Sequence, residues 1–252
     1  MTDAIDDPDV VDLWVRAGSD GSRNGGCPVC HQIFTVMLFK AGGDDQLRFN
    51  VKTVNPNKPL PAFRATGLRH VPALVHGPER RYEQPDEILD YIDHVFPKPD
   101  LTYADGIDAE TACKDVFSKF CFFIKDVNKD PKHLEFELRK VNSFLLSKPR
   151  KYLCGDQVTH LDCQIMPKLH HIRLACEYLK SYKIPNDLVG LWRYMKTAYA
   201  TPEFIKSCPS DQEIILYWAD RPDTKNLSAM EHKELSKQEP RFTNALPDDV
   251  QI

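Results

Sequence analysis

The feature that most constrains the fold is a pair of cysteines, Cys27-Pro28-Val29-Cys30, placed where a predicted strand gives way to a predicted helix. Apolar residues alternate over residues 11–16, which is the period of a strand, and recur at helical spacing over residues 33–38. Proline suits the first turn of a helix, because its missing N–H is no loss there. In this strand-to-helix context, the Cys-x-x-Cys spacing predicts a redox site.

The position of these cysteines also predicts their chemistry. A thiolate at a helix N-terminus is stabilised by free N–H groups and by the helix dipole. Its pKa falls from about 8.5 to roughly 3.5–7.5 in such sites. We therefore expect Cys27 to be the attacking thiolate and Cys30, one turn later, to resolve a mixed disulfide.

The rest of the N-terminal part fits the same kind of domain. Strands are predicted over residues 47–51 and 71–75 and around residues 81–83, and Pro85 opens an apolar-faced helix. The order is therefore βαβ followed by ββα. This order resembles thioredoxin-like domains, in which a cis-proline before the third strand faces the cysteine loop and leaves the preceding backbone free to pair with an extended thiol peptide. The resemblance implies a cis bond between Val71 and Pro72.

A proline-rich break at residues 97–100 separates this part from a helical one. Helices are predicted over Ala109–Val127, over residues 132–146 and from Pro185, and polar capping signatures precede two more. These signatures are Thr159-His160-Leu161-Asp162 and Ser210-Asp211-Gln212-Glu213. From Asp220 the chain is polar, and we expect a loosely held tail. The sequence therefore predicts an N-terminal domain over residues 1–97, an all-helical domain over residues 98–220 and a polar tail over residues 221–252.

Composition excludes several classes. The chain has 33 basic and 37 acidic residues, which argues against a nucleic-acid partner. Its acidic start, residues 1–9, is unlike a secretory signal, so we expect a cytoplasmic protein whose eight cysteines are reduced thiols. The best membrane-spanning candidate, residues 23–40, is apolar only over residues 33–39, short of the roughly 20 residues that a spanning helix needs.

Other interpretations of the cysteine pair remain open. Cys27-Pro28-Val29-Cys30-His31 matches the c-type haem attachment pattern, which requires export. Zinc would need two further ligands at suitable spacing, so we expect no metal site. Two inert thiols in a folded domain are the third alternative.

Four further groups of residues are weaker candidates. We expect His170-His171 to be one core and one surface residue, and Phe117, Phe120, Cys121 and Ile124 to be helix core. We expect a solvated loop at Lys148-Pro149-Arg150-Lys151. The functional alternatives for this basic stretch are contact with anionic lipid or nuclear import. His160 and Asp162 are discounted as an acid–base pair, because Thr159 and Asp162 already account for a helix cap.

A thioredoxin-like half, a proline linker and an all-helical half together resemble the glutathione transferase fold, as does Tyr152-Leu153-Cys154-Gly155-Asp156 before the first capping signature. More narrowly, the chain resembles the chloride intracellular channel (CLIC) family, in a form like its invertebrate members. The resemblance covers about residues 10–218, and three stretches carry it: residues 49–54, 162–169 and 208–214.

This resemblance implies a soluble monomer with glutaredoxin-like chemistry that uses glutathione as thiol co-substrate. Glutathione would contact Pro28, Val71, Pro72 and Gln84. The family also implies conditional membrane association and chloride conduction after a large rearrangement, with the inserting segment at about Cys27 to Val51. A non-catalytic scaffold that binds cytoskeletal or membrane partners is the alternative function.

Three departures from the family pattern bear on these implications. Many relatives lack one of the two cysteines, and this chain has both, which favours dithiol chemistry. Gln84 and Pro85 stand where an acidic residue and Ser or Thr are usual, which weakens the expected hold on glutathione. Charges at Lys40, Asp44, Asp45 and Arg48 interrupt the inserting segment, and each central charge costs about 2.5–3.5 kcal/mol on insertion scales.

Overall fold

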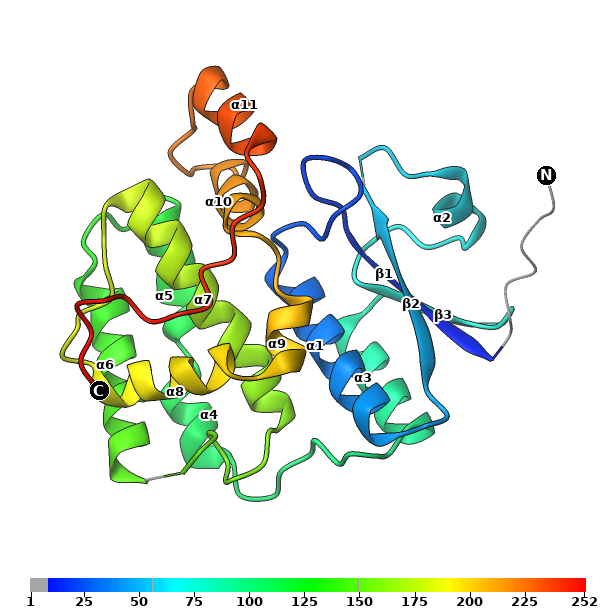
Figure 1. The fold of residues 1–252 in the computed structure, drawn as a ribbon, viewed down its shortest axis with the longest axis horizontal. Coiled ribbons are helices and arrows are strands. Elements are labelled where there is room, and N and C mark those ends of the chain that lie inside the picture. Colours follow the sequence, from blue (N-terminus) through cyan, green and yellow to red (C-terminus); the bar gives the residue numbers. More distant parts are fainter. Residues whose placement is uncertain (1–8, 56, 149) are drawn as a thin grey trace.

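The computed structural model describes residues 9–55, 57–148 and 150–252. The acidic start over residues 1–8, Pro56, and Pro149 in the middle of the predicted basic loop lie outside the described residues. A four-stranded mixed sheet and its helices form the N-terminal part, and helices alone form the rest (Figure 1).

The N-terminal elements follow the predicted order, with one short helix added. They are β1 (Val10–Arg16), α1 (Pro28–Gly43), β2 (Arg48–Val54), α2 (Pro61–Ala65), β3 (Ala73–His76), β4 (Arg80–Tyr82) and α3 (Pro85–Val95). The sheet order is β2-β1-β3-β4, in which β1 is parallel to β2 and antiparallel to β3. Strand β3 begins at Ala73 and not at the predicted Val71, because Pro72 has no N–H to donate to a neighbouring strand.

Eight helices of the described residues make up the C-terminal part. They are α4 (Ile107–Cys113), α5 (Val116–Ile124), α6 (Lys132–Ser147), α7 (His160–Lys180), α8 (Val189–Tyr199), α9 (Pro202–Ser207), α10 (Asp211–Ala219) and α11 (Ala229–Lys237). The single helix predicted over Ala109–Val127 is therefore two helices, and the helix predicted from Pro185 begins only at Val189. None of the helices in the described ranges combines the length and apolar character needed to cross a bilayer.

The two predicted capping signatures have different outcomes. At α7 the reciprocal box is present, and the Thr159 N–H donates to the Asp162 carboxylate at 2.9 Å. At α10 the Ser210 side chain accepts from the Glu213 N–H, but the Glu213 carboxylate does not return the bond. It accepts instead from the backbone N–H and the hydroxyl of Ser19, in the loop between β1 and α1. The predicted full capping box at Ser210 is therefore wrong.

The C-terminal tail is folded back onto the helical part, which corrects the expectation of a loosely held segment. Helix α11 begins with a capping box between Ser228 and Glu231. Beyond it, the Arg241 guanidinium pairs with the buried Asp211 carboxylate at 2.8 Å, and the chain runs along α7 and α8 to its end (Figure 1). The polar composition of the tail does not indicate this contact, because Arg241 pairs with a residue 30 positions earlier in the chain.

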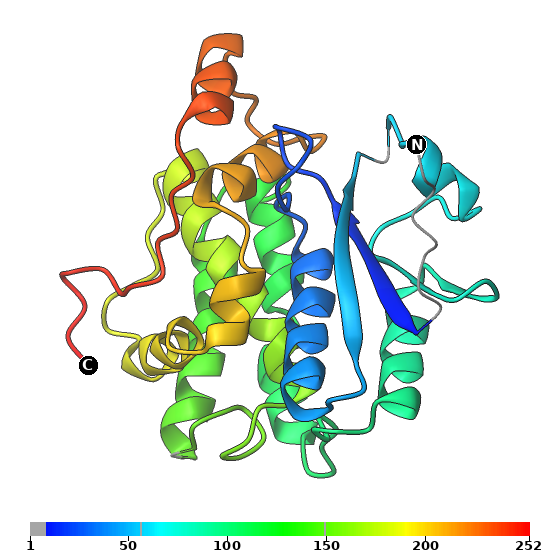
Figure 2. The same ribbon diagram turned by 45° about the vertical axis from the view of Figure 1, so that its right-hand side comes forward.

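Helix α1 lies between the sheet and the C-terminal helices α7 and α9 (Figure 2). Its buried apolar side chains face both sides, so the helix has no polar face toward solvent over most of its length. Lys40, 1% exposed, pairs with Asp93 at 2.7 Å and donates to the Pro99 carbonyl at 2.9 Å. The two parts of the chain therefore share a continuous interface that passes through α1.

Candidate active site

Cys27 is the residue that caps the N-terminus of α1, and Pro28 occupies the first turn. The Cys27 backbone carbonyl accepts the first helical bond from the His31 N–H, at 3.0 Å. Because the N–H groups of the first turn have no partners within a helix, they point toward the Cys27 side chain and favour an anion there. The predicted placement of the cysteine pair at the strand-to-helix junction is confirmed.

The hydrogen bonds to the Cys27 sulfur lower its pKa to about 6. The largest contribution is a hydrogen bond from the Cys30 thiol; burial opposes it, and the backbone N–H groups of Cys30 and Val29 and the Tyr217 side chain add to the lowering. Such hydrogen bonds stabilise the charged form of the acceptor, so the thiolate is favoured even in a covered position. Cys27 therefore has the electrostatic environment of a nucleophilic thiol.

Cys30 has the opposite environment. Burial and the adjacent Cys27 sulfur raise its pKa well above the usual range of a thiol. Its own sulfur receives the Arg16 backbone N–H at 3.4 Å. The pair is thus split into one sulfur that favours the anion and one that keeps its proton, which is the division of roles that a dithiol reaction requires. All eight cysteines are free thiols.

Helix α10 of the C-terminal part covers this site. Cys27 is only 8% exposed, and Tyr217 packs against the apolar cluster that contains both cysteines. A Cβ added at Gly26 would come within 2.3 Å of the Glu213 carbonyl oxygen, so only glycine lets the cysteine loop approach α10 this closely. Access to the Cys27 sulfur therefore depends on α10.

Tyr217 is the site residue that the sequence analysis missed. Two guanidinium groups stack on its ring, Arg221 at 4.0 Å and Arg16 at 5.6 Å from the ring centre. Burial and the Cys27 charge raise its pKa, which keeps the hydroxyl protonated as a donor. A cavity of about 310 Å³ lies beside it, between the β1–α1 loop and helices α10 and α11. The sequence gives no signal for this role, because Tyr217 is one of several aromatic residues in an apolar helix.

The predicted glutathione contacts are only partly brought together. The Val71–Pro72 bond is cis, as expected, and Val71 packs against the cluster that contains the cysteines. Pro28 is buried at the start of α1. Gln84 caps α3 without a side-chain cap bond and is exposed. The neighbouring Glu83 carboxylate accepts the N–H groups of Arg69 and His70, so it orders the loop that leads to Pro72.

The remaining candidates are structural. His170 and His171 are both buried, which corrects the expectation of one surface residue, since α7 is enclosed by α1, α5, α8 and α10.

The other weaker candidates also have structural roles. His160 pairs with Asp93 and not with Asp162. Phe120 and Ile124 are core, with Phe117 and Cys121 packed against it. Lys148 pairs with the exposed Asp108. The described residues contain no group of three side chains that could hold a metal ion.

Comparisons with known proteins agree with this architecture. A family profile described as the CLIC-like N-terminal domain matches residues 9–99. Chloride intracellular channel exl-1 of Caenorhabditis elegans is 39% identical over 234 residues, covering 92% of this chain and 97% of the relative. Chloride intracellular channel Clic of Drosophila melanogaster is 31% identical over 244 residues, covering 95% and 91%.

Solved structures confirm the predicted glutathione transferase fold, a thioredoxin-like part followed by an all-helical part. The CLIC homologue EXC-4 of C. elegans superposes with a TM-score of 0.81 at 27% identity, covering 96% of this chain and 95% of that one. The trimeric glutathione transferase TDR1 of Leishmania gives 0.63 at 18% identity over 82% of this chain and 48% of its own, which shows fold alone. The chain belongs to the chloride intracellular channel family.

Proposed function

We propose that this chain is a glutathione-dependent thiol–disulfide oxidoreductase that acts through Cys27 and Cys30. The observation that carries the proposal is the division between the two sulfurs, with the pKa of Cys27 lowered and that of Cys30 raised. Inert structural thiols need no such division, and in each of the other six cysteines desolvation raises the pKa of the thiol.

The reaction balances as two successive exchanges. The Cys27 thiolate attacks a disulfide R–S–S–R′, forms a mixed disulfide with R and releases R′ as a thiolate, which takes a proton from water. Cys30 then loses its proton and attacks the Cys27 sulfur, which releases R as a thiol and leaves a Cys27–Cys30 disulfide. Two glutathione molecules return the two electrons and leave as glutathione disulfide. The second step suits Cys30, which lies in hydrogen-bond contact with Cys27.

Substrate binding would use the backbone beside the cis bond at Val71 and Pro72, with the Pro28 turn below it. Gln84 would offer an amide, without charge, to the amino-acid end of glutathione. Since Cys27 is 8% exposed, a substrate disulfide must displace the Tyr217 side chain before attack. Admission of substrate would therefore be coupled to a small movement of α10.

The test compares wild type with Cys27→Ser for the glutathione-dependent reduction of a glutathione mixed disulfide. Cys121→Ser is the matched control, because Cys121 is partly exposed on α5 and far from the site in sequence. The proposal predicts loss of activity in Cys27→Ser and full activity in Cys121→Ser. Equal rates in wild type and Cys27→Ser would contradict it.

A second candidate function is conditional membrane association with passage of anions, and the names of the curated relatives favour it. The expected inserting segment, Cys27 to Val51, contains α1 with its apolar faces on both sides. Insertion would require Lys40 to leave Asp93, at the cost of a buried ion pair. Purified protein should then carry chloride across anionic liposomes, more at pH 5 than at pH 7; no flux at either pH would contradict this function.

The alternative of a non-catalytic scaffold for cytoskeletal or membrane partners makes the opposite prediction for the cysteine. In that case Cys27→Ser rescues the loss of the gene as well as wild type does. Under the redox proposal the protein works as a cytoplasmic monomer, and rescue fails with Cys27→Ser.

A further inference from the structure

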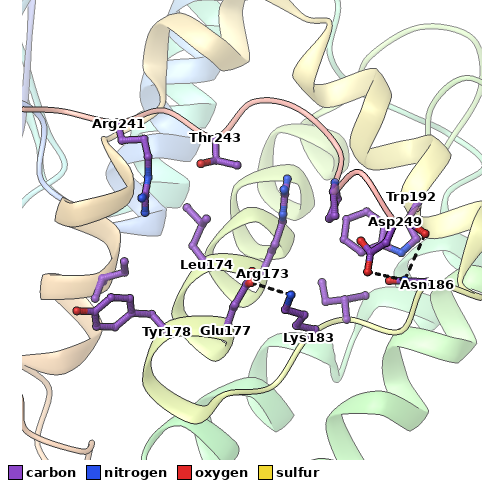
Figure 3. A pocket seen from close by; sticks show the side chains of 13 residues that line it. Arg173, Leu174, Glu177, Tyr178, Lys183, Asn186, Trp192, Arg241, Thr243 and Asp249 are labelled. Carbon is purple, nitrogen blue, oxygen red and sulfur yellow. Dashed lines mark hydrogen bonds and ion pairs between the residues drawn. The ribbon is translucent and has the colours of Figure 1, made fainter. Parts of the chain in front are cut away.

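A second cavity, of about 500 Å³, lies far from the cysteine pair, beneath the C-terminal segment. Its floor is one face of α7, with Arg173 and Leu174 followed one turn later by Glu177 and Tyr178. Residues of the loop before α8, of α8 and of α10 form its walls, and residues 241–249 cross above it (Figure 3). A volume of this size is typical of small-molecule sites.

Arg173 is the feature of this cavity that a purely structural role does not explain. It is 6% exposed and rises from α7 toward the C-terminal segment, with Arg241 to one side and Trp192 to the other (Figure 3). Its Nη1 donates to the Tyr199 hydroxyl at 3.0 Å and to the Ala245 carbonyl at 2.7 Å. One nitrogen of the guanidinium therefore accounts for all of its hydrogen bonds within the described chain.

The guanidinium lies over the Tyr199 and Trp192 rings, 5.4 and 5.7 Å from their centres, but its other edge has no hydrogen-bond or ion-pair partner among the described residues. Nε is buried without a hydrogen bond, and neither Nε nor Nη2 meets a carboxylate within ion-pair distance. Buried charges in proteins are normally paired, because an unpaired one loses its hydration without compensation. The Nε–Nη2 edge is also the fork that matches the two oxygens of a carboxylate.

The other charged groups of the cavity already have a hydrogen-bond or ion-pair partner. Lys183 meets Glu177 at 3.4 Å, and Arg241 meets Asp211 at 2.8 Å. The Asp249 carboxylate accepts from the Asn186 amide at 3.0 Å. Among the three cationic side chains that line the cavity, Arg173 alone has no carboxylate partner in the described part of the chain, so its guanidinium is the group that an anion would neutralise.

The walls specify the rest of the ligand. Four apolar side chains line the cavity: Leu174, Ile184, Trp192 and Ile215. An inorganic anion would make no apolar contact with these walls, whereas an apolar body attached to the anion would pack against them. We infer that this cavity binds a small amphipathic carboxylate, with its oxygens on the free edge of Arg173 and its apolar part against Trp192 and Ile184.

The test is calorimetric titration of the full chain with decanoate, below the concentration at which it forms micelles. Decanoate should bind at one site, and 1-decanol, which lacks the carboxylate, and sodium chloride should not. Arg173→Met should weaken decanoate binding at least tenfold, the size expected for losing a hydrogen bond to a charged group. Arg193→Gln is the matched control, since Arg193 carries the same charge on α8, is exposed and does not line the cavity.

Two further variants keep the inference testable if Arg173→Met does not fold. Glu177→Gln removes a negative charge from the exposed edge of the cavity, and it should tighten binding about threefold, as one exposed charge does. Trp192→Phe should abolish the quenching of tryptophan fluorescence by 2-bromodecanoate. Binding of 1-decanol equal to that of decanoate, unchanged affinity in Glu177→Gln, or quenching that survives Trp192→Phe would each overturn the inference.

Discussion

The Tyr217 side chain hydrogen-bonds the Cys27 sulfur, so a residue of the C-terminal helical part acts on the thiol of the thioredoxin-like part. This contact has two consequences that can be separated by mutation. The hydroxyl stabilises the thiolate, and the ring covers it.

Tyr217→Phe removes the hydroxyl and keeps the ring. We expect alkylation of Cys27 by iodoacetamide at pH 6 to slow about threefold, because a lost hydrogen bond to the thiolate raises its pKa. Tyr217→Ala removes both functions, so alkylation at high pH should instead become faster than in wild type. Tyr178→Phe, at an exposed tyrosine of α7, should match wild type. Identical behaviour of Tyr217→Phe and Tyr217→Ala would contradict the separation.

Cys30→Ala removes the hydrogen bond that lowers the pKa of Cys27 most. Alkylation of Cys27 at pH 6 should fall about tenfold, the size of a hydrogen bond to a charged group. The same variant lacks the resolving thiol, so a mixed disulfide at Cys27 should accumulate, which intact-mass spectrometry detects after reaction with glutathione disulfide. The account fails here if the adduct is resolved as fast as in wild type.

Some parts of this site could be predicted from sequence and others could not. The strand, the Cys-x-x-Cys turn and the helix are contiguous, so the local pattern predicted the position of Cys27 and the Thr159–Asp162 cap. The Glu213 carboxylate, in contrast, binds Ser19, 194 positions earlier, and such a partner is invisible to a local capping pattern. Tyr217 was missed for the same reason, since its contact with Cys27 exists only once the two parts of the chain pack.

The other differences between the predictions and the structure arise from burial by residues distant in the sequence. The adjacent His170 and His171 are both covered, because neighbours surround α7 on several sides and no side of this stretch faces solvent. The polar residues after Asp220 looked unattached, although Asp211, at the start of α10, is fully buried and anchors Arg241. In both cases the covering or anchoring residues lie far away along the chain, so a local sequence pattern does not indicate them.

Acid should destabilise the fold through these buried histidines. Burial lowers the pKa of His31 to about 3, and those of His170 and His171 fall well below the usual range. The unfolded chain therefore binds more protons than the folded one below about pH 6.5. Each such histidine removes about 1.4 kcal/mol from the free energy of unfolding per pH unit below that point.

Urea unfolding of wild type and His31→Leu between pH 7 and pH 5 measures this effect. His31→Leu should lose less stability over this interval than wild type, since one proton-linked site is gone. His94→Asn, at an exposed histidine of α3, is the control and should show the wild-type slope. A wild-type slope in His31→Leu as well would contradict the assignment.

The bond between Glu213 and Ser19 should hold the loop over residues 17–26 against α10. Glu213→Ala should lower the free energy of unfolding by about 1 kcal/mol, the usual size of such a hydrogen bond. Amide exchange in residues 17–26 should quicken, while exchange in β2 stays unchanged. Glu234→Ala is the control, because Glu234 is an exposed acidic residue of α11 and its side chain makes no hydrogen bond with the loop over residues 17–26. Unchanged loop exchange in Glu213→Ala would show that the bond does not hold the loop.

The pH dependence of Cys27 alkylation shows whether this residue is held as a thiolate. Quenched iodoacetamide reactions, read by mass spectrometry at the Cys27 peptide, give the midpoint without interference from the other cysteines. We expect a midpoint near 6. A midpoint near the ordinary thiol value of about 8.5 would contradict it.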